Sequence, residues 1–470
     1  MIDRHYFGTD GIRDIAGQGV MSAQFAFKVG MAAAETLKRH AATPVDGLRL
    51  RPEGVKPEGA GPTVVVGTDT RQSGSMLAHA VSAGLTARGA DVIWLGVMTT
   101  PGVSYLTRQT GADAGVVISA SHNPFEDNGI KLFNQGGEKL SEELERQIEQ
   151  LLGEELADLP PVTGRAIGRS SRYRHDNDDY AKFLLANAPY LDGLRVGLDC
   201  ANGASFEIAP RVFQQLGARL DVINAKPDGS NINVACGSTY PQAITKRVLE
   251  LGLEVGITFD GDADRAILVD KRGRLVTGDQ MLAICAVVRH EKQVVSTVMA
   301  NLGLEHYLAK RGIALLRTAV GDRYVFTALR EHGLLLGGEQ SGHLLFLDKA
   351  PTGDGILTAL QVLAAVRKSG KPLDAWLDEM PMYPQTIHNV RVAPEHKARI
   401  AELQAVQEAV QRAEAKLAGQ GRINLRPSGT EPLIRVMVEG PDQAVIEAIA
   451  KDVAAIVEHH SRFARVERAG

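Results

Sequence analysis

The chain has few cysteines and no long hydrophobic run. Cys200, Cys236 and Cys285 are its three cysteines in 470 residues, too few and too far apart for a disulfide framework or a CxxC metal site. We therefore expect buried, reduced thiols. No stretch of about 18 apolar residues is present, and the N-terminal stretch is charged from Asp3 onward and lacks the apolar core of a signal peptide. These features predict a cytoplasmic protein with no membrane partner.

The chain also lacks an excess of positive charge. Lysine and arginine number 52 against 56 aspartates and glutamates, which gives a formal net charge of −4. Nucleic-acid binding needs a basic surface, so no nucleic-acid partner is predicted, and any phosphate must be held by local clusters. Hydrophobic residues make up 44% and charged residues 23%, as in ordinary globular proteins.

The length and the hydrophobic pattern predict several domains. A chain of this length exceeds what one hydrophobic core organises. Up to about Pro384, short β-branched runs alternate with helical periods, which predicts three successive α/β domains with mixed, largely parallel sheets. The remainder predicts an α+β domain, with a helix over residues 396–417, two strands and a last helix over 442–459. We place the domains at residues 1–175, 176–277, 278–388 and 389–470.

Residues 40–62 form a stretch rich in proline and glycine with no apolar period. Such composition is typical of a mobile surface loop. We interpret it as an insertion and assign it no function.

A serine-containing loop, SASHNP at residues 119–124, directly follows the apolar run GVVI. A serine just past a strand end lies at the carboxyl edge of an α/β sheet, where reactive groups are placed. Two interpretations of Ser121 remain open: a reactive group, or a turn residue that only makes local hydrogen bonds before Pro124. No G-x-S-x-G surrounds it, which disfavours a hydrolase elbow.

An acidic loop, DGDADR at residues 260–265, lies between the apolar runs LEVGITF and AILVD. Its aspartates at alternate positions can converge on a hard cation, and Mg²⁺ suits carboxylates combined with a phosphate oxygen. An EF-hand is excluded, because Arg265 stands where that loop needs glycine and Lys271 where it needs glutamate. We predict a magnesium site here rather than an acidic, solvated turn.

A third polar loop, GGEQSGH at residues 337–343, joins two apolar runs. Glu339 and Ser341 offer an acceptor and a donor that suit sugar hydroxyls, and His343 can carry a proton near neutral pH. Taken alone, a histidine of this kind is more often structural than catalytic.

A fourth polar loop, RPSGTEP at residues 426–432, combines the groups that hold a phosphate. Arg426 offers a bidentate fork, Ser428 and Thr430 offer hydroxyls, and Gly429 lets backbone N–H groups approach closely. Arg435 on the following strand adds charge. An ordinary hairpin turn explains the glycine but not this clustering.

In this order along the chain, these loops and three further stretches resemble the signature motifs of the α-D-phosphohexomutases. The full set is FGTDGIR (7–13), SASHNP with DNGIK (127–131), DGDADR, VGDRYV (320–325), GEQSGH, TGDG (352–355) and RPSGTEP. The resemblance covers nearly the whole chain and implies four domains around a central cleft.

The resemblance also implies roles for residues in these motifs. Ser121 is the phosphorylated serine and holds one Mg²⁺ together with Asp260, Asp262 and Asp264. Further catalytic residues are Lys131, His343, Arg265, Arg13 and His122, with Lys131 and His343 as candidates for proton transfer. Lys131 can be a base only if its surroundings lower its pKa. Substrate-binding residues are Glu339, Ser341, Asp322, Arg323, Arg426, Ser428, Gly429, Thr430 and Arg435.

The implied reaction interconverts glucosamine 6-phosphate and glucosamine 1-phosphate. It runs through glucosamine 1,6-bisphosphate, which also activates the enzyme, and its product feeds UDP-N-acetylglucosamine synthesis. Family analogy alone suggests a homodimer. The alternatives are a mutase of mannose or glucose phosphates, a phosphatase, and a non-catalytic phosphosugar-binding protein.

The chain departs from the family pattern at two places. Ala263 stands where many relatives carry glycine, a change that is tolerated if the backbone there is not at positive φ. The stretch over residues 40–62 is longer than the family usually has.

Overall fold

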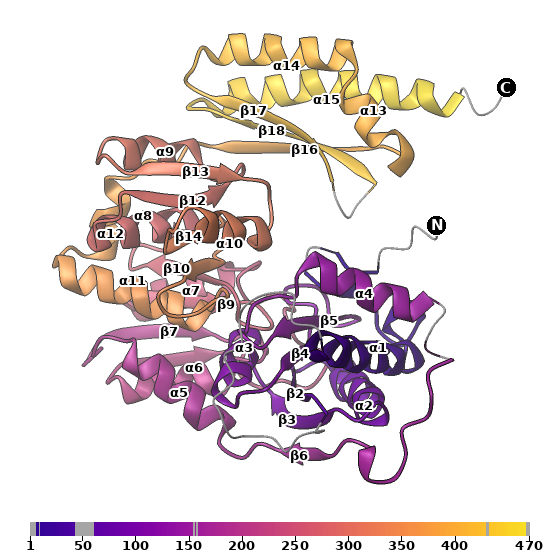
Figure 1. Cartoon of the computed structure of the whole chain (residues 1–470). Helices are drawn as coiled ribbons and strands as arrows, with labels where there is room; N and C mark the ends of the chain where they lie inside the picture. The colour runs from indigo at the N-terminus through magenta and orange to yellow at the C-terminus, as the bar shows by residue number, and fades with distance from the viewer. Residues whose placement is uncertain are drawn as a thin grey trace. The chain divides into compact units, whose positions relative to one another are not determined.

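The computed structural model describes residues 6–8, 10–42, 61–153, 156, 158–428 and 432–466 (Figure 1). The chain divides into two compact units: a large unit of Met1–Met299 with Ile313–Leu377, and a small unit of Ala300–Gly312 with Asp378–Gly470. Three mixed sheets in the large unit and one antiparallel sheet in the small unit confirm the predicted α/β and α+β fold classes. Most of the predicted insertion, residues 43–60, lies outside the described residues.

The first sheet has six strands in the order β1-β5-β4-β2-β3-β6. Its strands are β1 (Ile12–Ile15), β2 (Thr63–Thr68), β3 (Asp91–Val97), β4 (Ala114–Ile118), β5 (Asp127–Asn134) and β6 (Ser170–Arg172). Its helices are α1 (Ala23–Ala42), α2 (Gln72–Ala87), α3 (Thr100–Gln109) and α4 (Glu142–Gly153). Strand β4 is buried along its whole length and antiparallel to β5, with Val117 opposite Lys131. This register brings Lys131 beside the start of the serine loop.

The second sheet has five strands in the order β11-β10-β9-β7-β8. Its strands are β7 (Arg195–Asp199), β8 (Arg219–Ile223), β9 (Val255–Phe259), β10 (Ala266–Asp270) and β11 (Leu275–Val276). Helices α5 (Asp176–Ala186), α6 (Ile208–Gln215) and α7 (Gln242–Leu251) belong to this part of the chain. Strands β9 and β10 are antiparallel, with Phe259 opposite Ala266. The acidic loop is therefore the tight connection between two fully buried strands.

The third sheet has four strands in the order β13-β12-β14-β15. They are β12 (Gln293–Thr297), β13 (Ala314–Thr318), β14 (Leu336–Gly338) and β15 (Leu344–Phe346). Its helices are α8 (Gly278–Arg289), α10 (Asp322–Glu331), α11 (Gly355–Ser369) and α12 (Leu373–Asp378). Gly338 pairs with Leu344 across β14 and β15. Residues 339–343 of the third polar loop therefore form the turn between these two strands.

The small unit is an antiparallel sheet in the order β16-β18-β17, with helices α14 and α15 on one face (Figure 1). Its elements are β16 (Gln385–Arg391), β17 (Arg422–Pro427), β18 (Leu433–Glu439), α9 (Leu302–Ala309), α13 (Lys397–Ala401), α14 (Gln404–Leu417) and α15 (Gln443–Val466). The prediction of one helix over 396–417 is wrong, because the backbone at Leu403 is not helical. The break lets Ile400 and Val406 enter the same core, although six residues along one helix would place them on different faces.

Two observations on the described part of the chain bear on its composition. No helix there combines the length and the apolar character needed to cross a membrane. All three cysteines are buried and unpaired.

Candidate active site

Ser121 lies just beyond β4, fully buried, with its side chain directed at the acidic loop. Its Oγ donates to Asp260 Oδ2 at 2.5 Å and lies 3.4 Å from His122 Nδ1. Residues 139 positions apart in sequence thus meet where the first and second sheets adjoin. The contact favours a reactive role for this hydroxyl over a purely local turn role.

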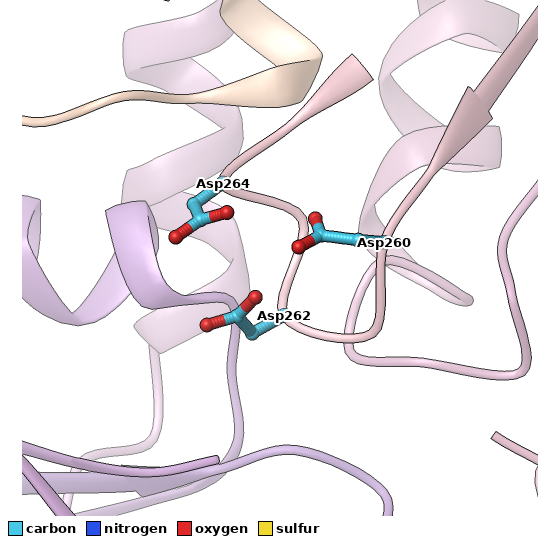
Figure 2. Close-up of side chains that lie close together, drawn as sticks. All are labelled: Asp260, Asp262 and Asp264. Atoms are coloured by element: carbon cyan, nitrogen blue, oxygen red, sulfur yellow. The ribbon is translucent and has the colours of Figure 1, made fainter. Parts of the chain in front are cut away.

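The three aspartates of the acidic loop point toward one centre (Figure 2). All three are buried, and one oxygen of each lies within 4.8 Å of the others. Burial, then the charges of Asp264 and Asp262, raise the pKa of Asp260 well above its usual value. Within the described structure, Asp262 Oδ1 and Asp264 Oδ1 accept no hydrogen bond. A cluster of this kind is costly unless a cation joins it, and hard oxygen donors fit Mg²⁺. The residues present could therefore hold a metal ion.

The backbone of Ala263 is left-handed, with φ +57°. The condition for easy replacement of glycine at this position is therefore not met, and an alanine in this region costs roughly 1 kcal/mol or more. Two backbone hydrogen bonds hold the conformation: Ala263 N donates to Asp260 O at 3.1 Å, and Gly355 N donates to Ala263 O at 2.9 Å. The TGDG motif thus stabilises the acidic loop through a backbone hydrogen bond.

Lys131 reaches the same centre from β5 and is almost fully buried. Its Nζ lies 3.0 Å from Asp10 Oδ2 and 2.8 Å from Asp262 Oδ2. Burial alone lowers the pKa of this ammonium, but the carboxylates of Asp10, Asp262 and Asp264 raise it above its ordinary value. The lowered pKa that a base requires is not found in this arrangement, in which Lys131 is a charge partner of the carboxylates.

The pKa values of the two histidines at the centre are shifted in opposite directions. Burial, followed by the charges of Arg265 and Arg13, lowers the pKa of His122 to about 4, and its Nδ1 lies 3.3 Å from Arg265 Nη1. Burial also disfavours the charged form of His343, but Asp264, Asp322 and Glu339 outweigh it and raise the pKa of His343. Its Nδ1 lies 3.7 Å from Asp264 Oδ1. His122 is thus the neutral ring, and His343 is the ring that is more readily protonated.

Three residues of the centre are absent from the sequence-based predictions. Thr100 Oγ1 donates to Asp262 Oδ2 at 2.5 Å. Lys139 Nζ lies 2.6 Å from both Asp10 Oδ1 and Asp322 Oδ2. Asp10 stands in the FGTDGIR motif, where it also accepts from Arg13, and Thr100 follows the end of β3, so both carried a signal. Lys139 carried none.

The predicted sugar-binding residues lie at the third sheet and are partly engaged with protein groups. Glu339 Oε1 accepts from Gly321 N at 3.1 Å, and Ser341 is exposed. Arg323 forks onto Glu145 of α4, with Nη2 to Oε1 at 2.6 Å and Nη1 to Oε2 at 3.0 Å. Arg323 therefore ties the start of α10 to helix α4 of the first sheet.

The predicted phosphate-binding residues of the small unit include two like charges. Arg426 and Arg435 stand directly opposite each other on β17 and β18. Burial and the charge of Arg435 lower the pKa of Arg426. Like charges directly opposite are destabilising, so this pair favours an anion. Ser428 is buried beside them in sequence, while the predicted Gly429 and Thr430 lie outside the described residues.

Models of phosphoglucomutase/phosphomannomutase domains match most of the chain. The alpha/beta/alpha domains I, II and III match residues 52–158, 178–273 and 277–383, and the C-terminal domain matches residues 388–456. The chain belongs to this family. It is thus a mutase, in line with the resemblance of its motifs.

Family members with high identity extend along almost the entire chain. Phosphoglucosamine mutase of Deinococcus radiodurans is 53% identical over 97% of this chain and 98% of its own length. Phosphoglucosamine mutase of a Thermus thermophilus strain is 47% identical, over 98% of this chain and 99% of its own.

Solved structures share the fold at lower identity. A phosphoglucomutase/phosphomannomutase family protein of Burkholderia thailandensis superimposes with a TM-score of 0.77 at 23% identity, covering 97% of both chains. Aspergillus fumigatus N-acetylphosphoglucosamine mutase, in complex with GlcNAc-6P and magnesium, has a TM-score of 0.67 at 18% identity and covers 97% of this chain and 96% of its own.

Proposed function

We propose that this enzyme interconverts glucosamine 6-phosphate and glucosamine 1-phosphate through a phosphorylated Ser121. The observation that carries the mechanism is the 2.5 Å contact of Ser121 Oγ with Asp260, inside a buried acidic cluster. The substrate is supported by relatives named phosphoglucosamine mutase, which are 47% and 53% identical to nearly the whole chain.

The proposed reaction consists of two phosphoryl transfers. In the first, the Oγ–P bond of phosphoserine 121 breaks, a P–O bond forms to the free hydroxyl of glucosamine 6-phosphate, and the hydroxyl proton passes to Ser121 Oγ. Glucosamine 1,6-bisphosphate then reorients. In the second transfer the P–O bond to the sugar's 6-oxygen breaks and a P–O bond forms to Ser121 Oγ. The Oγ proton passes to the 6-oxygen, and glucosamine 1-phosphate leaves. No atom is gained or lost over the cycle.

The residues around Ser121 have distinct roles in this proposal. Asp260, Asp262 and Asp264, with the phosphoserine, would hold one Mg²⁺, which supplies neutralisation of phosphate charge when bound. Arg265 adds positive charge beside His122, whose Nδ1 lies 3.4 Å from Ser121 Oγ. His343 is the candidate proton carrier, since its carboxylate neighbours favour its protonated form. Arg13 orients Asp10, to which it is bonded, and Lys131 balances the carboxylates.

Recognition of the substrate is assigned to two regions. Glu339, Ser341, Asp322 and Arg323 lie at the third sheet and would face the sugar. Arg426 and Arg435, with Ser428, Gly429 and Thr430, would hold the phosphate that is not reacting. A phosphate site in a separate fourth domain can serve both orientations of the bisphosphate. We also propose the division at residues 175, 277 and 388, a cytoplasmic location and a homodimer.

A coupled assay for glucosamine 1-phosphate tests the proposal. Parent, Ser121→Ala and Ser205→Ala are compared with glucosamine 6-phosphate, Mg²⁺ and a trace of the bisphosphate. Ser205 is a matched control, because it is equally buried and its Oγ donates to Cys200 O at 3.4 Å rather than to a carboxylate of the acidic loop. We expect activity to vanish in Ser121→Ala alone. If the parent is inactive on glucosamine 6-phosphate but turns over mannose or glucose phosphates, the enzyme is a mutase of those sugars. Steady release of inorganic phosphate would indicate a phosphatase.

A further inference from the structure

Arg71, just before α2, binds the backbone of the loop that carries Ser121. Its side chain is completely buried. Nη2 donates to Ser121 O and Asn123 O, each at 2.9 Å. Nη1 donates to Asp127 O at 3.1 Å and to Pro124 O. One guanidinium thus binds four carbonyl groups within residues 121–127, from the serine loop to the first residue of β5.

Arg71 is itself held by a short network that returns to Ser121. Its Nε lies 2.9 Å from Asp69 Oδ2, and its backbone N donates to Asp69 Oδ1 at 3.0 Å. Asp69 Oδ2 also accepts from Ser119 Oγ at 2.6 Å. Ser119 Oγ in turn accepts from Ser121 N at 2.9 Å. Both backbone groups of Ser121 are therefore bound by a network that begins at Arg71 and Asp69.

A second set of donors comes from the loop after β8. Asn233 Nδ2 donates to Ser121 O at 2.9 Å and to Asn123 O at 3.0 Å, the same two carbonyls that Arg71 Nη2 binds. Asn233 is anchored through its own backbone N, which donates to Ala201 O at 2.9 Å. The serine loop is thus bound by Arg71 from the part of the chain that forms the first sheet and by Asn233 from the part that forms the second.

The conformation of Ser121 explains why so many donors converge. Its φ is +52°, in the left-handed region that non-glycine residues rarely adopt. Such strain persists only where the surroundings over-determine the backbone, and it gathers at functional sites. In this conformation Oγ reaches Asp260. A shift of about 1 Å in a reacting atom can cost about 100-fold in rate.

We propose that Arg71, aided by Asn233, is a positioning residue for phosphoryl transfer at Ser121. It acts through the loop backbone and does not touch the substrate. The planar guanidinium offers five donors in a fixed fork, whereas a lysine ammonium offers three. A lysine in its place keeps the charge opposite Asp69 but cannot bind the same carbonyls. The inference rests on the proposed function.

The test compares Arg71→Lys and Asn233→Ala with Arg88→Lys. Arg88 is a matched control, because it is buried and binds a carbonyl, Pro160 O, and a carboxylate, Glu35, away from the serine loop. For each protein we measure kcat, KM, the rate at which glucose 1,6-bisphosphate phosphorylates Ser121, and the melting temperature. All rates are taken well below every melting temperature.

We expect Arg71→Lys to lower kcat and the phosphorylation rate by about 100-fold. Asn233→Ala should lower both by about 10-fold, since one of the two side chains that donate to the carbonyls of Ser121 and Asn123 is lost. KM should change little, and Arg88→Lys should lose stability but not rate. Equal rates in Arg71→Lys and Arg88→Lys would overturn the inference. If Arg71→Lys does not fold, an unaltered rate in Asn233→Ala overturns it. A parent inactive on glucosamine, mannose and glucose phosphates would defeat the proposed function itself, and the inference with it.

Discussion

The reaction centre of the large unit and the arginine pair of the small unit differ in how their charges are balanced. At the reaction centre acidic and basic side chains are mixed: Asp10, Asp262, Asp264 and Asp322 lie beside Lys131, Lys139, Arg265 and His343, and Asp260 accepts from Ser121. In the small unit, Arg426 and Arg435 face each other with the same sign. The first region thus offers a group of buried carboxylates to its proposed cation, and the second offers two guanidinium groups to its proposed phosphate.

The two regions also differ in how firmly they are held. At the reaction centre the serine, the lysine, the histidine and the three aspartates of the acidic loop are buried and contact one another: Ser121, Lys131, His343, Asp260, Asp262 and Asp264. Arg426 lies on a partly buried strand at the edge of its sheet. A fixed centre suits chemistry, which needs constant geometry, and a less enclosed pair suits a phosphate that must be bound and released in two orientations.

The largest effect is expected from removing a carboxylate of the acidic loop. Asp262→Ala takes away a proposed metal ligand that also bonds Lys131 and Thr100. Because a bound cation supplies several kcal/mol of charge stabilisation, turnover should fall by roughly 10³-fold or more. Turnover against Mg²⁺ concentration and calorimetric Mg²⁺ binding measure the loss.

A matched control stands at the other end of the same hairpin. Asp270 is equally buried, but its carboxylate binds Arg274. Asp270→Asn should alter stability and leave the Mg²⁺ requirement unchanged. If both variants lose Mg²⁺ binding alike, the acidic loop is not the metal site.

A buried carboxylate that is held only by neutral donors should lower the stability of the folded protein when it ionises. Asp354 is such a carboxylate. Neutral donors hold it, the hydroxyl of Tyr180 at 2.8 Å and the N–H of Leu357 at 2.9 Å. Burial raises its pKa from 3.8 to about 6. Its contribution to stability is therefore complete below about pH 4 and is lost as the pH rises through about 6.

Asp354→Asn keeps the helix cap and removes the ionisation. We expect the variant to be more stable than the parent at about pH 8, by up to about 3 kcal/mol, and the difference to disappear near pH 4. Melting temperatures across this range provide the measurement. Asp374, which pairs with Arg272 at 3.0 Å, is the contrasting control: Asp374→Asn should destabilise. A variant of Asp354 that melts below the parent at about pH 8 would contradict the argument.

The smallest effect is expected at the arginine pair. Arg426→Met removes a proposed charge-assisted contact to phosphate worth about 1.5–3 kcal/mol, so KM for glucosamine 6-phosphate should rise about 10- to 100-fold. The value of kcat should change far less. Arg391→Met, on the exposed side of neighbouring strand β16, is the control. Equal KM values in the two variants would show that this arginine pair does not bind the phosphate of the substrate.

The sequence predicts the parts of the site better than their contacts. Ser121 and the three aspartates stand out because each loop interrupts buried strands at a sheet edge. Their meeting depends on how two sheets pack, which no local pattern contains. The pKa of Lys131 is likewise a property of carboxylates brought from three segments.

Backbone details were also beyond local patterns. The positive φ of Ala263 and of Ser121 reflects hydrogen bonds from distant segments, and a helical period continues through Leu403 where the helix breaks. Arg71 stands at a strand end, as Ser121 does, but its role depends on carbonyls about 50 residues away.

The most direct test follows a labelled phosphoryl group from Ser121. Parent enzyme is phosphorylated with ³²P, freed of excess label and mixed with unlabelled glucosamine 6-phosphate and Mg²⁺ for a single turnover. The account predicts that label leaves Ser121, appears in glucosamine 1,6-bisphosphate, and is then found in glucosamine 1-phosphate. Label that stays on the protein, or is released as inorganic phosphate without entering a sugar, would contradict it.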